Sequence, residues 1–410
     1  MVPNGWKKTH LKCVISGTIK NGYSPLPAST TTGYWVLSLG ALTDHGINPL
    51  EIKPVVVDEK VKQALLSDGD FLISRSNTPD KVGRSIRFKN EVQNCSYPDL
   101  MMRFCVDTQK ADPNFIEIKL KSAEVRQYYK SCAAGSSSSM VKINKAVVEN
   151  TPLLLPSFPE QKKIAKILST WDKAITTTEQ LLANSQQQKK ALMQQLLTGQ
   201  KRLLDIKTGV IFDRDFKTLS LRDVCSMQAG KFINASDILN GHQDGTYPCF
   251  GGNGLRGYTK TFTHDGEFSL IGRQGALCGN ITFATGCFHA TEHAVVVTPR
   301  SNINTKWLYY ALVDLNLNQY ATGVAQPGLS VKNIEQVSIK VPESINEQQK
   351  IAAVLSAADQ EITTLKQKLD VLKQEKKSPD ATTADRQTAG QGRGGSMKKS
   401  DPSPHDRGRR

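Results

Sequence analysis

The chain contains one long segment twice. Residues 160–190 and 347–377 align without a gap, and 16 of their 31 positions are identical. The two copies read EQKKIAKILSTWDKAITTTEQLLANSQQQKK and EQQKIAAVLSAADQEITTLKQKLDVLKQEKK. A repeat of this length indicates that the chain is built from two related halves, because each copy corresponds to one structural unit.

Both copies predict a long helix with an apolar stripe along one side. The stripe recurs at alternating steps of four and three residues, a period typical of a coiled-coil seam. A helix of about 38 residues spans nearly 60 Å at ~1.5 Å per residue. Because neither helix can bury its stripe alone, each is expected to pair with the other; packing of each helix on its own domain is the alternative. The predicted seam comprises Ile164, Leu168, Trp171, Ile175, Leu182, Ile351, Leu355, Ala358, Ile362, Leu365, Leu369 and Leu372.

A strand-rich stretch precedes each helix, over roughly 1–158 and 218–342. β-Branched runs such as KPVVVD (53–58), DFLIS (70–74), EFSLIG (267–272) and HAVVVTP (293–299) predict strands. A strand-turn-strand pattern recurs in SDGDFLISRSNTPDKVGRSIRF (67–88) and HDGEFSLIGRQGALCGNITF (264–283). The halves therefore share an organisation in which a variable globular part is followed by a constant helix.

Charge and cysteine content narrow the function classes. The chain has 53 Lys and Arg against 38 Asp and Glu, a net charge of +15, which favours a polyanionic partner, with nucleic acid ahead of an anionic membrane surface. The N-terminal sequence has no apolar signal region, and no stretch approaches the ~20 apolar residues of a membrane span. The eight cysteines form no CxxC pair, which suits reduced thiols. A cytoplasmic protein without membrane contact is expected.

The motif around each helix resembles a known family. The pattern PxxxEQxKIAxxLSxxDxxIxxxxxLLxxxxxxKKxLMQQLLTG after a globular domain, together with YATGVAQPGLSVKNIEQVSIKVP before the second helix, resembles the specificity subunits of type I restriction–modification enzymes. The resemblance covers nearly the whole chain up to Lys377 and is specific in the helices. The globular parts match only in small pieces, as expected of parts that vary with the target.

The resemblance implies an α+β fold with two mixed α/β target-recognition domains and two long helices that form an antiparallel coiled coil, as a pseudo-twofold internal repeat. It implies a non-catalytic subunit without cofactor or metal, whose partners are double-stranded DNA, two methyltransferase subunits and restriction-translocase subunits. Each domain would read one half of a bipartite, asymmetric DNA target, and the helices would space the domains and dock the methyltransferase subunits. The expected boundaries are 1–158 for the first domain, 159–199 for the first helix, 200–217 for a linker, 218–342 for the second domain, 343–377 for the second helix and 378–410 for a tail.

The candidate DNA-binding residues lie on and around the repeated strand-turn-strand pattern. Base edges are read by hydrogen-bonding side chains, and phosphates are bound by Lys and Arg. The Gly-rich segment YPCFGGNGLRGYTKTF (247–262) permits close backbone approach, although an ordinary turn is the alternative interpretation. The candidates are Arg75, Asn77, Lys81, Arg84, Arg87 and Lys142, with Ser137 and Ser138 as weaker ones, and in the second half Lys231, Asn253, Arg256, Lys260, Arg273 and Gln274.

No catalytic motif is present in the sequence. FGGNGLRG lacks the GK[ST] of a Walker loop, and no GxGxxG follows a strand. Cys278, Cys287, His289 and His293 match no standard zinc spacing and are interpreted as buried thiols and strand-end histidines. Asp70 and Glu267 precede equivalent strands and are interpreted as turn residues. Catalysis would therefore belong to partner subunits.

The second copy of the repeat breaks off after Lys377. The first copy continues as ALMQQLLTG (191–199), whereas the second continues as SPDATTADRQTAG. Codons can be chosen for this string that encode ALMQQLLTGKRQ after removal of one base. We therefore hypothesise a one-base insertion upstream, in the adenine run encoding Lys376 and Lys377, so that 378–410 is an out-of-frame and disordered tail. There are two alternatives. Slippage at this run could act as a natural on/off switch of the reading frame, or the tail could be a functional basic segment.

Two hypotheses of different classes remain. The first is the non-catalytic DNA-sequence reader; the second is a coiled-coil interaction or scaffold protein whose globular domains bind a partner other than DNA. A stand-alone enzyme ranks third, because no motif supports it.

Overall fold

The computed structural model describes residues 4–44, 46–137, 140–205, 208–275, 277–323 and 327–377. Residue contacts divide them into two units. The first contains the described residues up to Ala174 and those from Leu372, and the second is Ile175–Val371. Both boundaries fall inside the two long helices, α5 (Phe158–Leu197) and α9 (Ile345–Lys377). The predicted tail, 378–410, lies outside the described residues.

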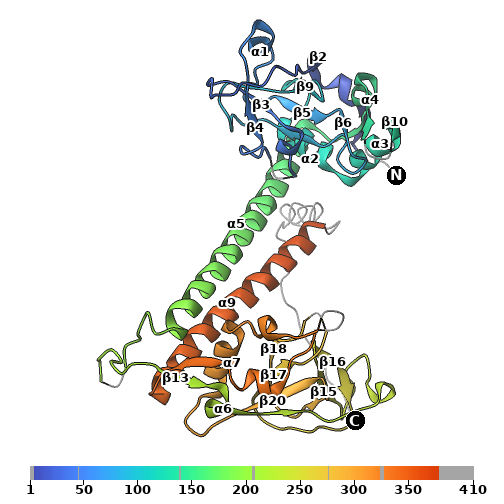
Figure 1. Ribbon diagram of the computed structural model, residues 1–410. Coiled ribbons are helices and arrows are strands. Elements are labelled where there is room, and N and C mark those ends of the chain that lie inside the picture. The colour runs from blue at the N-terminus through green and yellow to red at the C-terminus, as the bar shows by residue number, and fades with distance from the viewer. Residues whose placement is uncertain are drawn as a thin grey trace, which may run out of the picture. The chain divides into compact units, whose positions relative to one another are not determined.

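The first unit is built on four small sheets (Figure 1). The largest has the order β2-β9-β5-β7, with all neighbours antiparallel. Its strands are β2 (Ile15–Asn21), β9 (Met101–Val106), β5 (Phe71–Ser74) and β7 (Ser85–Arg87). The others are β4-β3-β8, β10-β11-β6 and β1-β12, formed by β1 (Lys7–His10), β3 (Trp35–Leu37), β4 (Ile52–Pro54), β6 (Ser76–Asn77), β8 (Cys95–Ser96), β10 (Ala134–Ser137), β11 (Met140–Lys142) and β12 (Pro152–Leu155).

Short helices cover this unit. They are α1 (Glu59–Gln63), α2 (Pro113–Lys121), α3 (Ala123–Cys132) and α4 (Lys145–Glu149), with 3₁₀ turns η1 (Leu11–Cys13) and η2 (Leu39–Ala41). Asp112 begins α2 by accepting a hydrogen bond from the Phe115 N–H at 3.0 Å, and Pro113 follows at the position where a missing N–H costs nothing. The helix buries Phe115 and Ile116 in the core formed with β5 and β9.

The second unit repeats the three main sheets in the same order. They are β14-β20-β17-β18, β16-β15-β19 and β13-β21. The sheets β4-β3-β8 and β16-β15-β19 each have one antiparallel and one parallel pairing. The strands are β13 (Lys217–Ser220), β14 (Cys225–Ala229), β15 (Tyr247–Gly251), β16 (Gly254–Thr259), β17 (Phe268–Gly272), β18 (Ile281–Ala284), β19 (His289–Ala290), β20 (Ala294–Pro299) and β21 (Ser338–Val341).

The helices of the second unit follow the same plan. They are α6 (Leu221–Val224), α7 (Thr305–Asp314) and α8 (Val331–Ile334), with 3₁₀ turns η3 (Ala235–Asp237) and η4 (Leu317–Tyr320). Figure 1 shows α7 beside β17, β18 and β20, where Trp307 and Leu308 are buried. Asn304 caps α7 through the Trp307 N–H at 2.9 Å, as Asp112 caps α2. The α+β class and the predicted strand-turn-strand repeat are both present.

One predicted strand is shorter than its sequence suggested. KPVVVD (53–58) pairs regularly only up to Pro54, and Val55 adds an isolated bridge to Pro27. The extended run ends because Asp58 caps α1, accepting a hydrogen bond from the Val61 N–H at 2.7 Å. The β-branched composition favoured a strand, but the capping carboxylate ended it.

The two long helices contact each other within the second unit (Figure 1). Ser185 Oγ donates to Glu361 Oε1 at 3.1 Å, and Lys189 Nζ lies 2.6 Å from Asp359 Oδ1. The residue number falls along one helix as it rises along the other. All twelve predicted seam residues are buried or half-buried. In the first unit, Lys376 of α9 bonds Asp172 of α5.

Part of the predicted seam packs on the globular cores instead. Ile351 and Leu355 are fully buried in the core that contains Trp307, and Ile164 packs against the core of the first unit. The alternative of a helix packed on its own domain therefore applies to the first turns of each helix. The end of α5 also belongs to the core of the second unit, through Met193, Leu196 and Leu197.

Candidate nucleic-acid interface

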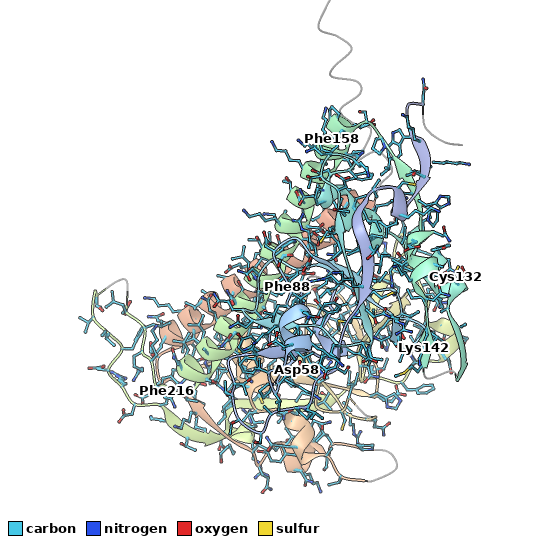
Figure 2. The ribbon with its side chains drawn as sticks, turned by 90° about the horizontal axis from the view of Figure 1, so that it is seen from above. Asp58, Phe88, Cys132, Lys142, Phe158 and Phe216 are labelled. Atoms are coloured by element: carbon cyan, nitrogen blue, oxygen red, sulfur yellow. The ribbon has the colours of Figure 1, made fainter. Side chains whose placement is uncertain are left out.

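A polar loop follows the buried strand β5 in the first unit. Arg75 is held through its backbone on two sides: its N–H donates to the Leu100 carbonyl, and its carbonyl accepts from the Ile143 N–H, both at 2.9 Å. Beyond it, β6 pairs with β11, so that Ser76 lies opposite Lys142. Figure 2 shows Lys142 near Cys132, the last residue of α3. The fold thus brings the predicted candidates Arg75, Asn77 and Lys142 together on adjacent segments.

The second unit places Arg273 in the same backbone environment. The Arg273 N–H donates to the His293 carbonyl, and its carbonyl accepts from the Leu329 N–H, again both at 2.9 Å. Gln274 then forms a bridge with Gly328, at the position where Ser76 pairs with Lys142 in the first unit. Arg75 and Arg273 therefore occupy equivalent backbone positions in the two units.

The neighbouring hairpins differ between the units. In the second unit, β15 and β16 are joined by Gly252 and Asn253 alone, whereas residues 38–51 connect β3 and β4 in the first. The Gly-rich segment 247–262 thus contains a tight hairpin. Asn253 lies at its tip, Arg256 on its second strand and Lys260 directly after that strand. No candidate was placed on the longer loop of the first unit.

Glycine is required where this hairpin meets the loop after β17. A Cβ on Gly272 would lie 1.9 Å from the Gly252 carbonyl oxygen, and one on Gly252 would lie 3.3 Å from the Gln274 carbonyl oxygen. Any side chain at Gly272 would force the two segments apart. The close approach holds Asn253, Arg256 and Gln274 around one hollow.

This hollow, called the hairpin cavity, has a volume of about 500 Å³. Its walls are glycines of the two loops and five side chains: Asn253, Leu255, Arg256, Gln274 and His293. Three of the predicted candidates therefore share one concave surface, which offers amide, guanidinium and imidazole groups for hydrogen bonding. Arg273 precedes Gln274 and is exposed, whereas Lys231 and Lys260 are exposed elsewhere in the unit.

Some first-unit candidates already have partners within the protein. Arg84 donates to the Leu42 carbonyl at 3.1 Å, and its Nε lies 3.1 Å from Asp44 Oδ1. Arg87 Nε lies 3.6 Å from Glu117 Oε2. The Asn77 amide donates to Ser74 Oγ at 3.2 Å, while its oxygen accepts from the Thr78 N–H. These groups support the fold, so their donors are less available to DNA.

The other candidates keep their donors free. Among the described residues, no hydrogen bond or ion pair engages the side chains of Arg75, Lys81, Lys142, Lys231, Asn253, Arg256, Lys260, Arg273 and Gln274. Unengaged donors on loops are what base and phosphate contacts require. Ser138 lies outside the described residues.

Two polar groups beside the hairpin cavity were not among the predicted DNA-binding candidates. His293 lines it, with Nε2 at 3.3 Å from Glu292 Oε1, and Thr291 is fully buried with no partner for its hydroxyl in the described structure. The described residues contain no group of three or more potential metal ligands, so Cys278, Cys287, His289 and His293 form no such group there. His293 was interpreted from the sequence as a strand-end histidine, and the turn between β19 and β20 places it at the cavity.

Asp70 is more than a turn residue. It is buried, and its carboxylate accepts hydrogen bonds from the Ser67 N–H at 2.8 Å and from Arg103 Nη1 at 3.3 Å. The interpretation as a turn residue agrees with the Ser67 bonds but did not include Arg103, which lies on β9, 33 residues away in the chain. The pair fixes the start of β5, and hence the position of Arg75 at its end.

Several thiols have a raised pKa, whereas hydrogen bonds with Thr9 and His10 lower the pKa of the exposed Cys13. All eight cysteines are free. Burial raises the pKa of Cys95 to about 12 and that of Cys225 to about 12, and burial with a hydrogen bond to Asp70 raises the pKa of Cys105 to about 11. A nucleophilic thiol needs the opposite shift. The expectation of reduced thiols agrees with this arrangement.

The sequence matches the family model described as "Type I restriction modification DNA specificity domain" over residues 57–184 and 213–374. These matches cover well over half of the chain. The chain belongs to this family. No helix in the described part of this family member is long and apolar enough to cross a membrane.

Individual relatives and solved structures agree with this assignment. The chain is 42% identical over 214 residues to the type I restriction enzyme EcoprrI specificity subunit of Escherichia coli, a match that covers 51% of this chain and 52% of that protein. It is 23% identical over 225 residues to a putative type I restriction enzyme MjaX specificity subunit of Methanocaldococcus jannaschii, covering 54% and 50%. The chain thus spans about half the length of these curated relatives.

The fold is similar to that of a solved type I restriction–modification S subunit from M. genitalium. The TM-score is 0.65 at 15% identity, with 91% of this chain and 95% of that chain covered. A structure described as the basis of complex assembly and conformational transition of the type I R-M system has a TM-score of 0.50 at 18% identity, with 94% and 98% covered. At these identities the likeness concerns the fold.

Proposed function

We propose that this chain is the DNA sequence-recognition subunit of a type I restriction–modification complex. Each globular domain reads one half of a bipartite DNA target, and catalysis belongs to partner subunits. The observation that carries the proposal is the equivalence of Arg75 and Arg273, two exposed or half-exposed arginines fixed by the same backbone hydrogen bonds in two domains of one family. Two related readers with different side chains would recognise two different half-sites.

The electrostatics support a duplex partner. The chain carries a net charge of +15, and nine of the twelve candidate side chains have no internal hydrogen-bond or ion-pair partner among the described residues. Phosphate contacts give affinity, and donors aimed at base edges give specificity. In this proposal Lys81, Lys142, Lys231 and Lys260 bind the phosphate backbone, whereas Asn253, Arg256 and Gln274 face the bases.

The long helices are proposed to form an antiparallel coiled coil that spaces the domains. The opposite numbering of the contacts Ser185–Glu361 and Lys189–Asp359 supports this direction. A pseudo-twofold relation between the halves would follow, as would a target whose half-sites are separated by unread bases, close to one helical turn of ~34 Å from centre to centre. The description of one similar structure refers to complex assembly of the type I R-M system, which supports assembly with partner subunits. These partners are proposed to be methyltransferase and restriction-translocase subunits, and the exposed polar faces of α5 and α9 are the proposed docking surface for the methyltransferase.

The test maps the methylated positions of the whole genome of a host cell, its methylome. The chain is co-expressed with its cognate methyltransferase subunit in an unmethylated host, and N6-methyladenine is mapped by long-read sequencing. A new split, asymmetric motif is the expected result. If this chain and a version with the reading frame restored after Lys377 both leave no motif, the DNA-reader proposal fails, and the scaffold hypothesis takes its place.

A further inference from the structure

The tip of the β15–β16 hairpin exposes an apolar side chain among polar ones. Leu255 is 54% exposed, although it lines the hairpin cavity between Asn253 and Arg256. All three side chains reach solvent. Burial of this side chain against an apolar group of a partner would be favourable.

A bulge places Leu255 and Arg256 on the surface together. Cys249 pairs with Gly257 and Phe250 pairs with Leu255, so Arg256 has no residue opposite it. In a regular strand, successive side chains point to opposite faces, and one of the two would be turned inward. The bulge removes that alternation, and bulges of this kind commonly re-aim side chains beside functional sites.

The hairpin is held rigidly in this shape. On its outer side, Leu239 exchanges both backbone hydrogen bonds with Tyr258, at 2.8 and 2.9 Å. A Cβ on Gly257 would lie 2.4 Å from the Leu239 carbonyl oxygen, so only glycine allows that approach. Gly254 adopts a φ of +91°, the left-handed conformation that glycine favours. The backbone on both sides of Leu255 is therefore constrained.

The chemistry of duplex DNA supplies one matching group. A two-stranded β-ribbon fits the major groove, where the only apolar group on a base edge is the C5-methyl of thymine. Arginine beside it can bind guanine O6 and N7 with two hydrogen bonds. We propose that Leu255 is a specificity-determining residue that contacts a thymine methyl group in the half-site read by the second domain. This inference rests on the proposed function.

The contact is expected in one half-site only. The first domain has no two-residue hairpin at this place, because residues 38–51 connect β3 and β4. Part of that connection is tied down, since Arg84 binds the Leu42 carbonyl and Asp44. The two half-sites are therefore read by differently built elements.

The experiment uses the full chain assembled with its methyltransferase subunit and the target given by the methylome. Each thymine of both half-sites is replaced in turn by deoxyuridine, which lacks only the methyl group, and binding is measured by fluorescence anisotropy. Three proteins are compared: the unchanged chain, Leu255→Ala, and Leu204→Ala as a control. Leu204 is a leucine of the same unit with nearly equal exposure, 53%, outside the hairpin.

Deoxyuridine is expected to weaken binding at only one position, in one half-site. There the unchanged chain and Leu204→Ala should bind about fourfold more weakly, which is the effect of one buried methyl group. Leu255→Ala should bind thymine-containing DNA more weakly and show no further loss with deoxyuridine. Equal sensitivity of Leu255→Ala and the unchanged chain, insensitivity of both, or a target without thymine would overturn the inference. In these cases sequence-specific binding persists, so the proposed function survives; loss of all specificity in the unchanged chain would instead refute both.

Discussion

The side-chain oxygen of Gln348, on α9, accepts a hydrogen bond from the backbone N–H of Asn304 at 2.8 Å. Gln161, the equivalent residue of α5, accepts from the Asp112 N–H at 2.9 Å. Each amide also donates to a proline carbonyl at 3.0 Å, that of Pro342 or Pro156. Both glutamines are almost fully buried. The repeated Glu-Gln motif thus fastens the first turn of each long helix to the cap of a helix in its own globular domain.

Replacement of Gln348 by Leu should destabilise the second domain by about 2–3 kcal/mol. The change keeps the side chain's bulk but leaves the Asn304 N–H and the Pro342 carbonyl buried without partners. Urea unfolding followed by tryptophan fluorescence measures it, because Trp307 is fully buried in this core. Gln360→Leu, at an exposed position of the same helix, is the control and should change stability by less than about 0.5 kcal/mol. Equal effects of the two variants would contradict the fastening role.

Sequence reasoning predicted the parts of this fold that local pattern determines. The repeat, the β-branched strands β5 and β17, and the long helices follow from periodicity and composition. It missed what depends on distant residues: burial of Gln161 and Gln348, the Arg103–Asp70 pair, and engagement of Arg84 by Asp44, 40 residues away. A polar residue in a helical motif is expected to face solvent unless its buried hydrogen-bond partners are known. Likewise, no sequence pattern reveals the bulge that exposes both Leu255 and Arg256.

The Arg202–Glu347 pair gives a second stability prediction. Arg202 binds the Glu347 carboxylate with two hydrogen bonds, at 2.8 and 2.9 Å, and Glu347 is 1% exposed. Arg202→Met would leave a buried carboxylate without its counter-ion, at a cost of about 3–5 kcal/mol. Chemical unfolding measures the loss.

The exposed pair Lys217–Glu343 is the matched control in the same unit. Lys217→Met should cost less than about 1 kcal/mol, because exposed ion pairs contribute little. If Arg202→Met proved as mild as Lys217→Met, Glu347 would have to be satisfied by another group.

Glu117 should make the first domain sensitive to acid. Burial raises the pKa of its carboxyl, but Lys121, Lys89 and Arg87 outweigh that effect and hold the pKa below its ordinary value of 4.5. A lowered pKa in the folded state adds stability above about pH 4.5, and this stability is lost as the pH falls through the folded pKa. Glu117→Gln should therefore lower the melting temperature at pH 7 and reduce the difference in melting temperature between pH 7 and pH 3.5. Asp68→Asn, at an exposed position of the same domain, is the control and should leave the pH dependence of the melting temperature as in the unchanged chain. If Glu117→Gln lowered the melting temperature equally at both pH values, the link between Glu117 and acid sensitivity would be contradicted.

Substitutions of Arg256 and Arg84 should have separate effects, the first on DNA binding and the second on stability. Arg256→Gln removes a guanidinium that has no partner in the described structure and should weaken specific binding by about 1–3 kcal/mol, with the melting temperature unchanged. Arg84→Gln breaks bonds to Leu42 and Asp44 and should lower the melting temperature of the first domain. Anisotropy titrations on cognate and scrambled duplexes, beside calorimetry, give both readouts. An equal loss on cognate and scrambled DNA for Arg256→Gln would place Arg256 on the phosphate backbone instead.

The last prediction concerns the segment after Lys377. In the second unit, Leu192, Met193, Leu196 and Leu197 at the end of α5 pack into the globular core. The repeat places residues 378–386 at the equivalent point of the second helix, where the sequence reads SPDATTADR in place of ALMQQLLTG. Replacing these nine residues by ALMQQLLTG should extend α9 and cover apolar surface of the first domain. Since a buried Leu or Met contributes about 1.5–3 kcal/mol, a net gain of several kcal/mol is expected after the cost of ordering the segment.

A control graft separates apolar packing from helix extension. The sequence ASSQQSSTG keeps the length but lacks the four apolar side chains, and it should leave the melting temperature of the first domain unchanged. Hydrogen exchange resolved by peptide shows which domain gains protection, because a two-domain chain has no single unfolding transition. We expect increased protection only in the first domain and only in the ALMQQLLTG graft. That graft alone gives α9 the apolar pairs that anchor the end of α5. Equal protection from both grafts would mean that the lost turns do not pack on the domain, and the hypothesis of a frame change that removes a stabilising contact would then fail.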